Sequence, residues 1–384
     1  MSLFKKLPKN QKVIENHEKI ENIANTLVRS FDSIMGTIGL GGRKGNYDDY
    51  NYQFFGGEKD GLRKKHYDKS LKLLWKAQEH APWSSFDDCT NGEVELIQLA
   101  KSSFNEEEKK EYQRISNSDY KDFLKKTYSL DERKAIANIL ALIGHGEAYA
   151  WMVSTEILNE VKSTGGRAAL TAQVLEEAKH FVVLREIVRA FDVEIPRLSA
   201  WEYVLLERGF KSKGLEKFFA MNVVVEGFAL NLFGMLSHLP GLEILRLFHL
   251  DESRHTALPT NYFKEFPMSF WEKHSPIRRI RRFSLILPAL PVFVQIESDL
   301  AEIGVDGMEF GGSMARKVAN LADKVGFHFP MSKDQFASLI NLIFNAYCKT
   351  TREGHEHRDF MKSETTKGKK ELAVEKEVFR FKTA

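Results

Sequence analysis

Apolar residues that recur every three or four positions dominate this chain. The first such stripe covers residues 11–38, and this spacing is typical of one face of a helix. Its members are Val13, Ile14, Ile20, Ile23, Leu27, Phe31, Ile34 and Ile38. Strict alternation of apolar and polar residues, which marks a half-buried strand, is scarce along the whole chain. The pattern therefore predicts an all-α protein.

A glycine-rich segment at 39–61 interrupts the helical pattern and is expected to form a loop. A phosphate-binding loop is not favoured there, because no strand precedes it and the Lys–Ser/Thr pair of such loops is missing. Shorter helices are predicted over 60–80, 91–102 and 105–126.

The most regular stretch is 130–266, which holds four long helical patterns. Helix-ending signals separate them: a Ser-Thr-Gly-Gly run, an Ile-Pro pair and a Leu-Pro-Gly run. A connector that contains a short helix follows the second break. The three breaks lie at Ser163–Gly166, at Ile195–Pro196 and at Leu239–Gly241. The connector runs from the second break to Ser212–Gly214. We expect two helical hairpins that pack as a four-helix bundle.

The rest of the chain is expected to extend this bundle. Helices of 1–129, with the glycine-rich loop, should pack on it, and helices of 267–361 should complete the same domain. The charged tail at 362–384 is expected to be solvated.

One segment combines basic and apolar residues. Four arginines (Arg278, Arg279, Arg281 and Arg282) precede the apolar run 283–294. Such a combination can mark contact with a membrane surface. Two prolines and a length of a dozen residues fit a buried packing segment better.

Composition narrows the class of protein. The 384 residues include 56 Lys+Arg and 53 Asp+Glu, a net charge of +3, which gives no global field for nucleic acid. Cys89 and Cys348 are the only cysteines, which excludes a disulfide-rich scaffold and a cysteine-based zinc site. No signal-like apolar run opens the chain, and no run reaches about 18 uninterrupted apolar residues. A cytoplasmic protein is expected.

Carboxylates and imidazoles occupy positions in the four central helices where apolar residues belong. One Glu lies on the buried face of the first and of the third helix, and a Glu-x-x-His pair lies on the second and on the fourth. These residues are Glu147, then Glu177 and His180, then Glu226, and finally Glu252 and His255. Burying several charges without partners costs several kcal/mol each, so a positive ion is expected among them.

The spacing of these residues tests this expectation. Residues that face each other in an antiparallel hairpin are equidistant from its turn. Glu147 and Glu177 are centred on residue 162, and Glu226 and Glu252 on residue 239, and both centres coincide with predicted breaks. Each hairpin should therefore bring a lone Glu level with a Glu-x-x-His pair. Two such hairpins would converge four carboxylates and two imidazoles on one point.

This set of ligands is the one by which ferritin-like di-iron and di-manganese carboxylate bundles hold two metals. Residues 130–266 resemble that ferritin-like di-iron carboxylate superfamily. The matching residues are Glu147, Glu177-Ala178-Lys179-His180, Glu226 and Glu252-Ser253-Arg254-His255. The resemblance implies that Glu177 and Glu252 bridge two iron ions, with Glu147 and His180 on one and Glu226 and His255 on the other.

Residues beside the motifs extend the resemblance. A metal-bound imidazole usually donates its second N–H to a carboxylate. By the resemblance, Asp251 would accept this N–H from His180, and Glu176 would accept it from His255. Arg254 would pair with these carboxylates.

His249 is a further imidazole near the motif, three residues before Glu252. Arylamine N-oxygenases of the superfamily have an extra His four residues before this Glu, where the present chain has Phe248. His249 is therefore expected in the core or beside the ligands. Pro259 predicts a kink just beyond His255.

Carboxylate-rich ligation suits Fe(II) or Mn(II) and leaves positions open for O2. The first hypothesis is an oxidoreductase of the hydroxylase, desaturase or N-oxygenase type. It would use an Fe/Fe or Mn/Fe pair and O2 on a small organic or acyl substrate. The chain lacks flavin, NAD and iron–sulfur motifs, so an external ferredoxin or reductase is expected as electron donor. A homodimer is left open.

Two alternatives share this metal site. A ferroxidase or iron-handling protein would need little beyond the bundle, whereas 129 residues precede it and 118 follow it here. That additional chain favours an enzyme. A radical-generating subunit would need a tyrosine near a metal. Tyr262 lies two helical turns beyond His255 on the same face, but Tyr149 points elsewhere, so this alternative is the weaker one.

Overall fold

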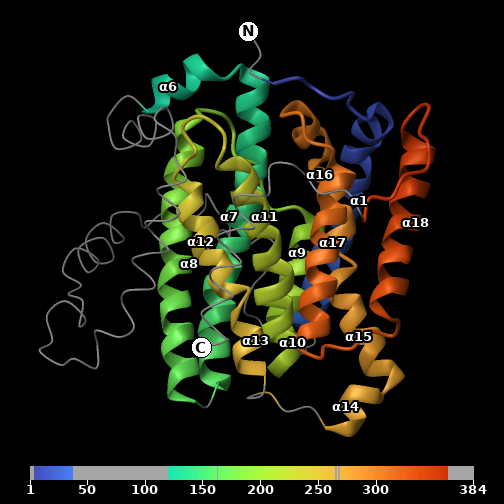
Figure 1. The fold of residues 1–384 in the computed structure, drawn as a ribbon. Coiled ribbons are helices and arrows are strands. Elements are labelled where there is room, and N and C mark those ends of the chain that lie inside the picture. The colour runs from blue at the N-terminus through green and yellow to red at the C-terminus, as the bar shows by residue number, and fades with distance from the viewer. Residues whose placement is uncertain (1–3, 38–119, 162, 264–265, 267–268, 362–384) are drawn as a thin grey trace, which may run out of the picture.

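The computed structural model describes residues 4–37, 120–161, 163–263, 266 and 269–361 (Figure 1). Within these ranges the chain forms helices and their connections, with no strand, as the sequence predicts. The expected loop at 39–61, the helices at 60–80 and 91–102, and the tail at 362–384 lie outside the described residues.

The first central hairpin consists of α7 (Leu130–Glu160) and α8 (Thr164–Ala190). A capping box of Ser129 and Glu132 begins α7. Ser163 caps α8 by accepting a hydrogen bond from the backbone N–H of Gly166 at 3.0 Å, which confirms the predicted break.

Helix α8 ends at Ala190, before the predicted end at Ile195. Asp192 adopts a left-handed backbone conformation with φ of 54°. Its carboxylate pairs with Lys121 and Lys125, at 2.6 and 2.7 Å, on the helix α6 (Tyr120–Thr127). These long-range ion pairs accompany the early end, and the local sequence does not reveal them.

The second hairpin consists of α10 (Gly214–Phe219), η3 (Ala220–Val225) and α11 (Glu226–Leu236), followed by α12 (Leu245–His255). The sequence predicts one uninterrupted α-helix in the first half of this hairpin. That prediction is wrong over Ala220–Val225, since η3 is a π-helical turn. Gly241, with φ of +86°, lies in the connection predicted at Leu239–Gly241.

The predicted change of direction beyond His255 takes the form of a helix end. Helix α12 stops at His255, and the short helix α13 (Leu258–Tyr262) begins with Pro259 in its first turn. Tyr262 therefore belongs to a separate helix and does not continue the face of α12, which corrects the sequence pattern.

The two hairpins pack against each other through α7 with α11 and through α8 with α12. Figure 1 shows these four helices side by side. Their facing sides supply much of a core cluster that includes Ile136, Leu140, Ile143, Leu184, Leu232, Phe233, Leu245 and Phe248.

The other described helices surround this bundle. Helix α16 packs on α7, α17 on α16 and α11, α18 on α17, and α9 on α7. Helix α1 contacts α9, α16 and α18, yet most of its predicted apolar stripe is exposed. The bounds are α1 Gln11–Thr37, α9 Ala200–Lys211, α14 Phe270–His274, α15 Pro276–Ile286, α16 Ala289–Glu302, α17 Gly307–Lys324 and α18 Lys333–Thr351.

Two helical stretches are long and apolar enough to cross a membrane, judged by length and composition. The most apolar part of Gly214–Leu236 is 83% buried inside the protein, as expected for a core helix. The corresponding part of Pro276–Glu302 is only half buried.

Candidate metal centre

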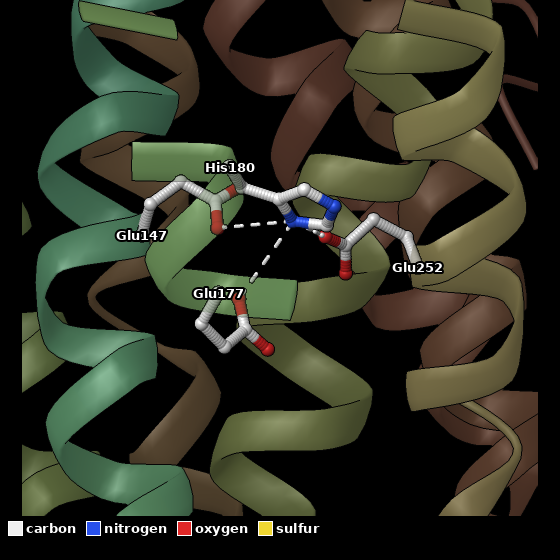
Figure 2. Close-up of side chains that lie close together, drawn as sticks. All are labelled: Glu147, Glu177, His180 and Glu252. Atoms are coloured by element: carbon white, nitrogen blue, oxygen red, sulfur yellow. Dashed lines mark ion pairs between the residues drawn. The ribbon is translucent and has the colours of Figure 1, made fainter. Parts of the chain in front are cut away.

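The six residues that the sequence singles out come together in the middle of the bundle. Each of their side chains is at most 2% exposed. They form two groups, and in each group one ligand atom per residue lies within 4.8 Å of the others. The first group is Glu147, Glu177, His180 and Glu252 (Figure 2), and the second is Glu177, Glu226, Glu252 and His255. Glu177 and Glu252 belong to both groups.

Both imidazoles turn the same nitrogen toward the carboxylates. His180 Nδ1 lies 3.0 Å from Glu252 Oε1 and 3.5 Å from Glu147 Oε2. His255 Nδ1 lies 3.1 Å from Glu177 Oε1 and 3.8 Å from Glu226 Oε1. Each imidazole therefore has carboxylates from both hairpins around one ring nitrogen.

Several polar atoms of the cluster are buried without a hydrogen-bond partner among the described residues. They are both carboxylate oxygens of Glu147, Glu177 Oε2, Glu252 Oε1 and His180 Nδ1. Leaving a buried polar atom unsatisfied costs about 1–3 kcal/mol, and more for a charged group. Lone pairs that converge in this way fit a cation, which would satisfy all of them together.

Burial and mutual charge perturb the acidities of the cluster. Burial raises the pKa of Glu147 well above its ordinary value, and burial together with the charges of Glu177 and Glu252 does the same to Glu226. Burial also acts to raise the pKa of Glu177 and of Glu252, but neighbouring groups, His255 and His180 among them, together lower both values. The protein alone thus holds protons at this centre, and binding of cations would release them.

The carboxylates that were expected to hold the imidazoles lie where the resemblance implies. Burial alone would lower the pKa of His180 and of His255. The surrounding carboxylates outweigh burial and raise both pKa values well above the ordinary value of histidine. His180 Nε2 is 3.0 Å from Asp251 Oδ2, and His255 Nε2 is 2.9 Å from Glu176 Oε2. Arg254 joins the two carboxylates by hydrogen bonds to Asp251, at 2.6 Å, and to Glu176.

His249 lies outside both groups. Its Nδ1 is 2.9 Å from the backbone oxygen of Leu230, and the residue is buried. Phe248 stacks on the ring of His180 with 4.4 Å between centroids. The position that is His in the arylamine N-oxygenases therefore packs against an imidazole here.

Two buried amides next to the carboxylates were not assigned a role from the sequence. Gln173 Nε2 donates to Glu177 Oε1 at 3.0 Å and to Glu226 Oε1 at 3.1 Å. Asn222 Nδ2 donates to Gln173 Oε1 at 2.9 Å and to the backbone oxygen of His255 at 3.1 Å. Both amides lie four residues before a Glu of the cluster, on its helix face, and this spacing is a signal that could have found them.

The π-helical turn η3 was also missed. It ends just before Glu226, whose backbone N–H donates to the oxygen of Met221, five residues earlier. Such turns occur frequently at functional sites. Here the turn sets the position from which Glu226 reaches the other carboxylates.

An apolar pocket adjoins the cluster on the side of Glu147 and Glu226. The pocket is open to solvent, and its volume including the open part is about 480 Å³. Besides these two residues and Glu202, the lining is apolar: Leu142, Ile143, Gly146, Ala150, Leu205, Leu206, Val225, Phe228, Ala229 and Val292. The fold thus brings a mainly apolar space to two of the four carboxylates.

A second apolar pocket lies between α15–α16 and α17–α18. Leu287 and Phe293 are among its lining residues, and Phe293 packs against Phe228 of the first pocket with 5.2 Å between ring centroids.

No family model, curated protein or solved structure matches this chain.

Proposed function

We propose that this chain is a di-metal carboxylate oxidoreductase that uses O2 to oxidise an organic substrate, as the ferritin-like superfamily it resembles would imply. The observation that carries the proposal is the pair of buried ligand groups with Glu177 and Glu252 in common. Four carboxylates and two imidazoles suit Fe(II) or Mn(II). When bound, two iron ions or a manganese–iron pair would supply the redox chemistry that activates O2.

The protein's own residues would hold and orient this pair. Glu147 and His180 would bind one ion, Glu226 and His255 the other, and Glu177 and Glu252 both. With a metal bound, Asp251 would accept the Nε2–H of His180, whose Nε2 lies 3.0 Å away, and Nδ1 would coordinate. Glu176 would do the same for His255. Gln173 holds Glu177 and Glu226 at a fixed separation through its two donated hydrogen bonds.

The first pocket supports an organic substrate. Its apolar walls would exclude water from the reacting centre and receive the apolar part of a substrate beside Glu147 and Glu226. This favours a hydroxylase, desaturase or N-oxygenase over the ferroxidase alternative, which needs no such pocket. The electrons for turnover would come from a separate ferredoxin or reductase.

The test is anaerobic reconstitution of the full-length protein with Fe(II), followed by exposure to O2. We expect about two irons per chain, O2 consumption and new near-ultraviolet absorption. Glu252→Gln should lower the iron content to below one per chain. The matched control is Glu302→Gln, because Glu302 is also buried but pairs with Lys6 and Lys9 away from the centre.

The outcomes separate the hypotheses. Fewer than one iron per wild-type chain would contradict the di-metal centre itself. The other outcome is that the chain binds two irons, but O2 consumption depends only on the amount of added Fe(II). If no acyl or aromatic substrate changes that consumption, the result would favour the ferroxidase.

A further inference from the structure

The helices α14 and α15 carry large apolar side chains that face solvent. Phe270 and Trp271 on α14 are 70% and 76% exposed, and Ile277 and Ile280 on α15 are 78% and 58% exposed. Ile277 and Ile280 are one helical turn apart, so they lie on the same side of α15. Four large exposed apolar groups thus lie within eleven residues on two consecutive helices, and such clusters often mark interaction sites.

Cationic side chains lie among these apolar groups. Lys273, Arg278 and Arg281 are exposed, and Arg279 is half-buried. Arg281 pairs with Glu216 at 3.3 Å while remaining 53% exposed. Glu272, the acidic residue within α14, accepts a hydrogen bond from the backbone N–H of Ser269 at 2.7 Å in the cap of that helix. The surface is therefore cationic as well as apolar.

The opposite side of α15 faces the protein. Arg282, Leu285 and Ile286 are buried, and the guanidinium of Arg282 lies over the ring of Phe327. Half of the apolar run that follows the arginines is buried and Leu287 is exposed, so the expected buried packing segment is confirmed only in part. The sequence pattern did not predict that Ile277 and Ile280, which lie next to the arginines, would face solvent.

The arrangement of charge and apolar groups identifies the partner. Helix α14 lies at one end of the molecule, and α15 rises from it toward α16 (Figure 1). An 11-residue helix is about 16 Å long, too short to span a bilayer but suited to lie in its interface. Arginine and lysine next to tryptophan, phenylalanine and isoleucine match the anionic headgroups and adjoining acyl region of a membrane.

The second pocket supports a lipid over an acidic protein. Leu287, one residue beyond α15, is 40% exposed and also lines this apolar pocket. An apolar pocket that an exposed residue next to α15 helps to line suits an acyl chain below an anionic headgroup, and acidic side chains of a peptide would not fill it.

We propose that α14 and α15 form a docking surface for a membrane that contains anionic phospholipid. This proposal does not depend on the metal centre. The apolar side chains enter the interface, and Lys273 and Arg278 pair with headgroup phosphates.

The experiment is co-sedimentation of the full-length protein with vesicles of phosphatidylcholine containing 30% phosphatidylglycerol, and with vesicles of phosphatidylcholine alone. We expect binding to the anionic vesicles, at least tenfold weaker binding to the neutral ones, and weakening at high salt. Each basic residue near the surface contributes about fivefold in affinity, so Lys273→Gln with Arg278→Gln should weaken binding about twentyfold or more. Trp271→Ser with Ile277→Ser should weaken it to a similar extent.

The controls are matched in chemistry. Lys333→Gln with Lys349→Gln changes two exposed lysines on α18, and Leu342→Ser changes a 62% exposed leucine on the same helix. These variants should bind as the wild type does. Trp271→Phe should retain binding but lose most of the blue shift of tryptophan fluorescence on vesicle addition.

Two results would overturn the proposal. One is absence of binding to anionic vesicles at low salt. The other is binding that the α14–α15 and α18 variants weaken equally, because nonspecific charge attraction would then explain it. A surface that ignores vesicles but binds an acidic protein domain would instead be a protein interface.

Discussion

At the scale of single residues, the main feature is a set of acids buried without enough positive charge. Four glutamates surround two imidazoles, and several of their oxygens have no hydrogen-bond partner among the described residues. Such an arrangement is destabilising unless another charge completes it. Gln173 is the residue that connects acids from both hairpins, since its amide donates to Glu177 and to Glu226.

Gln173→Leu tests this connection. The leucine keeps a similar volume but donates no hydrogen bond, so Glu177 and Glu226 lose their fixed orientation. We expect affinity for Mn(II) to fall about 10–100-fold, the usual effect of removing a group that orients metal ligands. Competition titration against a chelator measures it. The control is Gln295→Leu, whose amide has hydrogen bonds with Ser199 and Glu202, neither of which belongs to the two ligand groups. Equal affinities for Gln173→Leu and the wild type would contradict the assigned role.

At the scale of elements, the turns of the two hairpins decide whether the acids meet. The polar cap at Ser163 and the glycine at Gly241 both lie where the sequence predicted a break. Gly241 adopts φ of +86°, which side chains with a Cβ rarely adopt, and a Cβ there would lie 2.8 Å from Phe123. The connection between α11 and α12 therefore requires glycine.

Gly241→Ala should destabilise the protein by about 1–3 kcal/mol, because strain and the clash with Phe123 add together. Denaturant unfolding of the metal-free protein measures this. Gly227→Ala is the matched control, since Gly227 lies in α11 and a Cβ there would meet no atom within 4 Å. In a helix interior, alanine should be neutral or stabilising by up to about 1 kcal/mol. Similar effects at the two glycines would refute the argument.

At the scale of the whole molecule, the outer helices enclose the central bundle. Helix α16 packs on α7, and Asp299 of α16 accepts a hydrogen bond from Asn138 of α7 at 3.1 Å. Burial raises the pKa of Asp299 to about 7. An acid whose pKa is higher in the folded than in the unfolded state stabilises the fold only while it is protonated.

The metal-free wild type should therefore lose stability relative to Asp299→Asn as the pH rises from 4 to 7, with no further change above pH 7. The relative loss should be about 2 kcal/mol, less than the full pKa shift would give, because Asp299 is partly exposed. Denaturant unfolding at pH 4 and pH 8 measures it. The control for the change of charge is Asp323→Asn, an exposed residue on α17. A pH-independent difference at Asp299 would contradict the prediction.

Much of the centre could be predicted from the sequence because helical periodicity and hairpin spacing are local properties. The period of apolar residues assigned Glu147, Glu177, His180, Glu226, Glu252 and His255 to buried faces, and the two turns placed them level with each other. The carboxylates beside the imidazoles followed from the resemblance. The early end of α8 did not follow, since Asp192 pairs there with Lys121 and Lys125 of a distant segment. The π-helical turn before Glu226 did not follow from the apolar period either. The spacing of Gln173 from Glu177 is a local signal, but its bond to Glu226 joins the two hairpins and depends on the tertiary structure.

The sequence by itself determined the helical class, the two hairpins and the acids that each would bury, because these follow from periodicity and turn chemistry. The tertiary structure alone decided that Gln173 would connect the hairpins and that an apolar pocket would adjoin Glu147 and Glu226. It also decided that Ile277 and Ile280 would face solvent among arginines. The physical reason is that an amphipathic pattern shows which face is apolar, but only packing determines what covers that face.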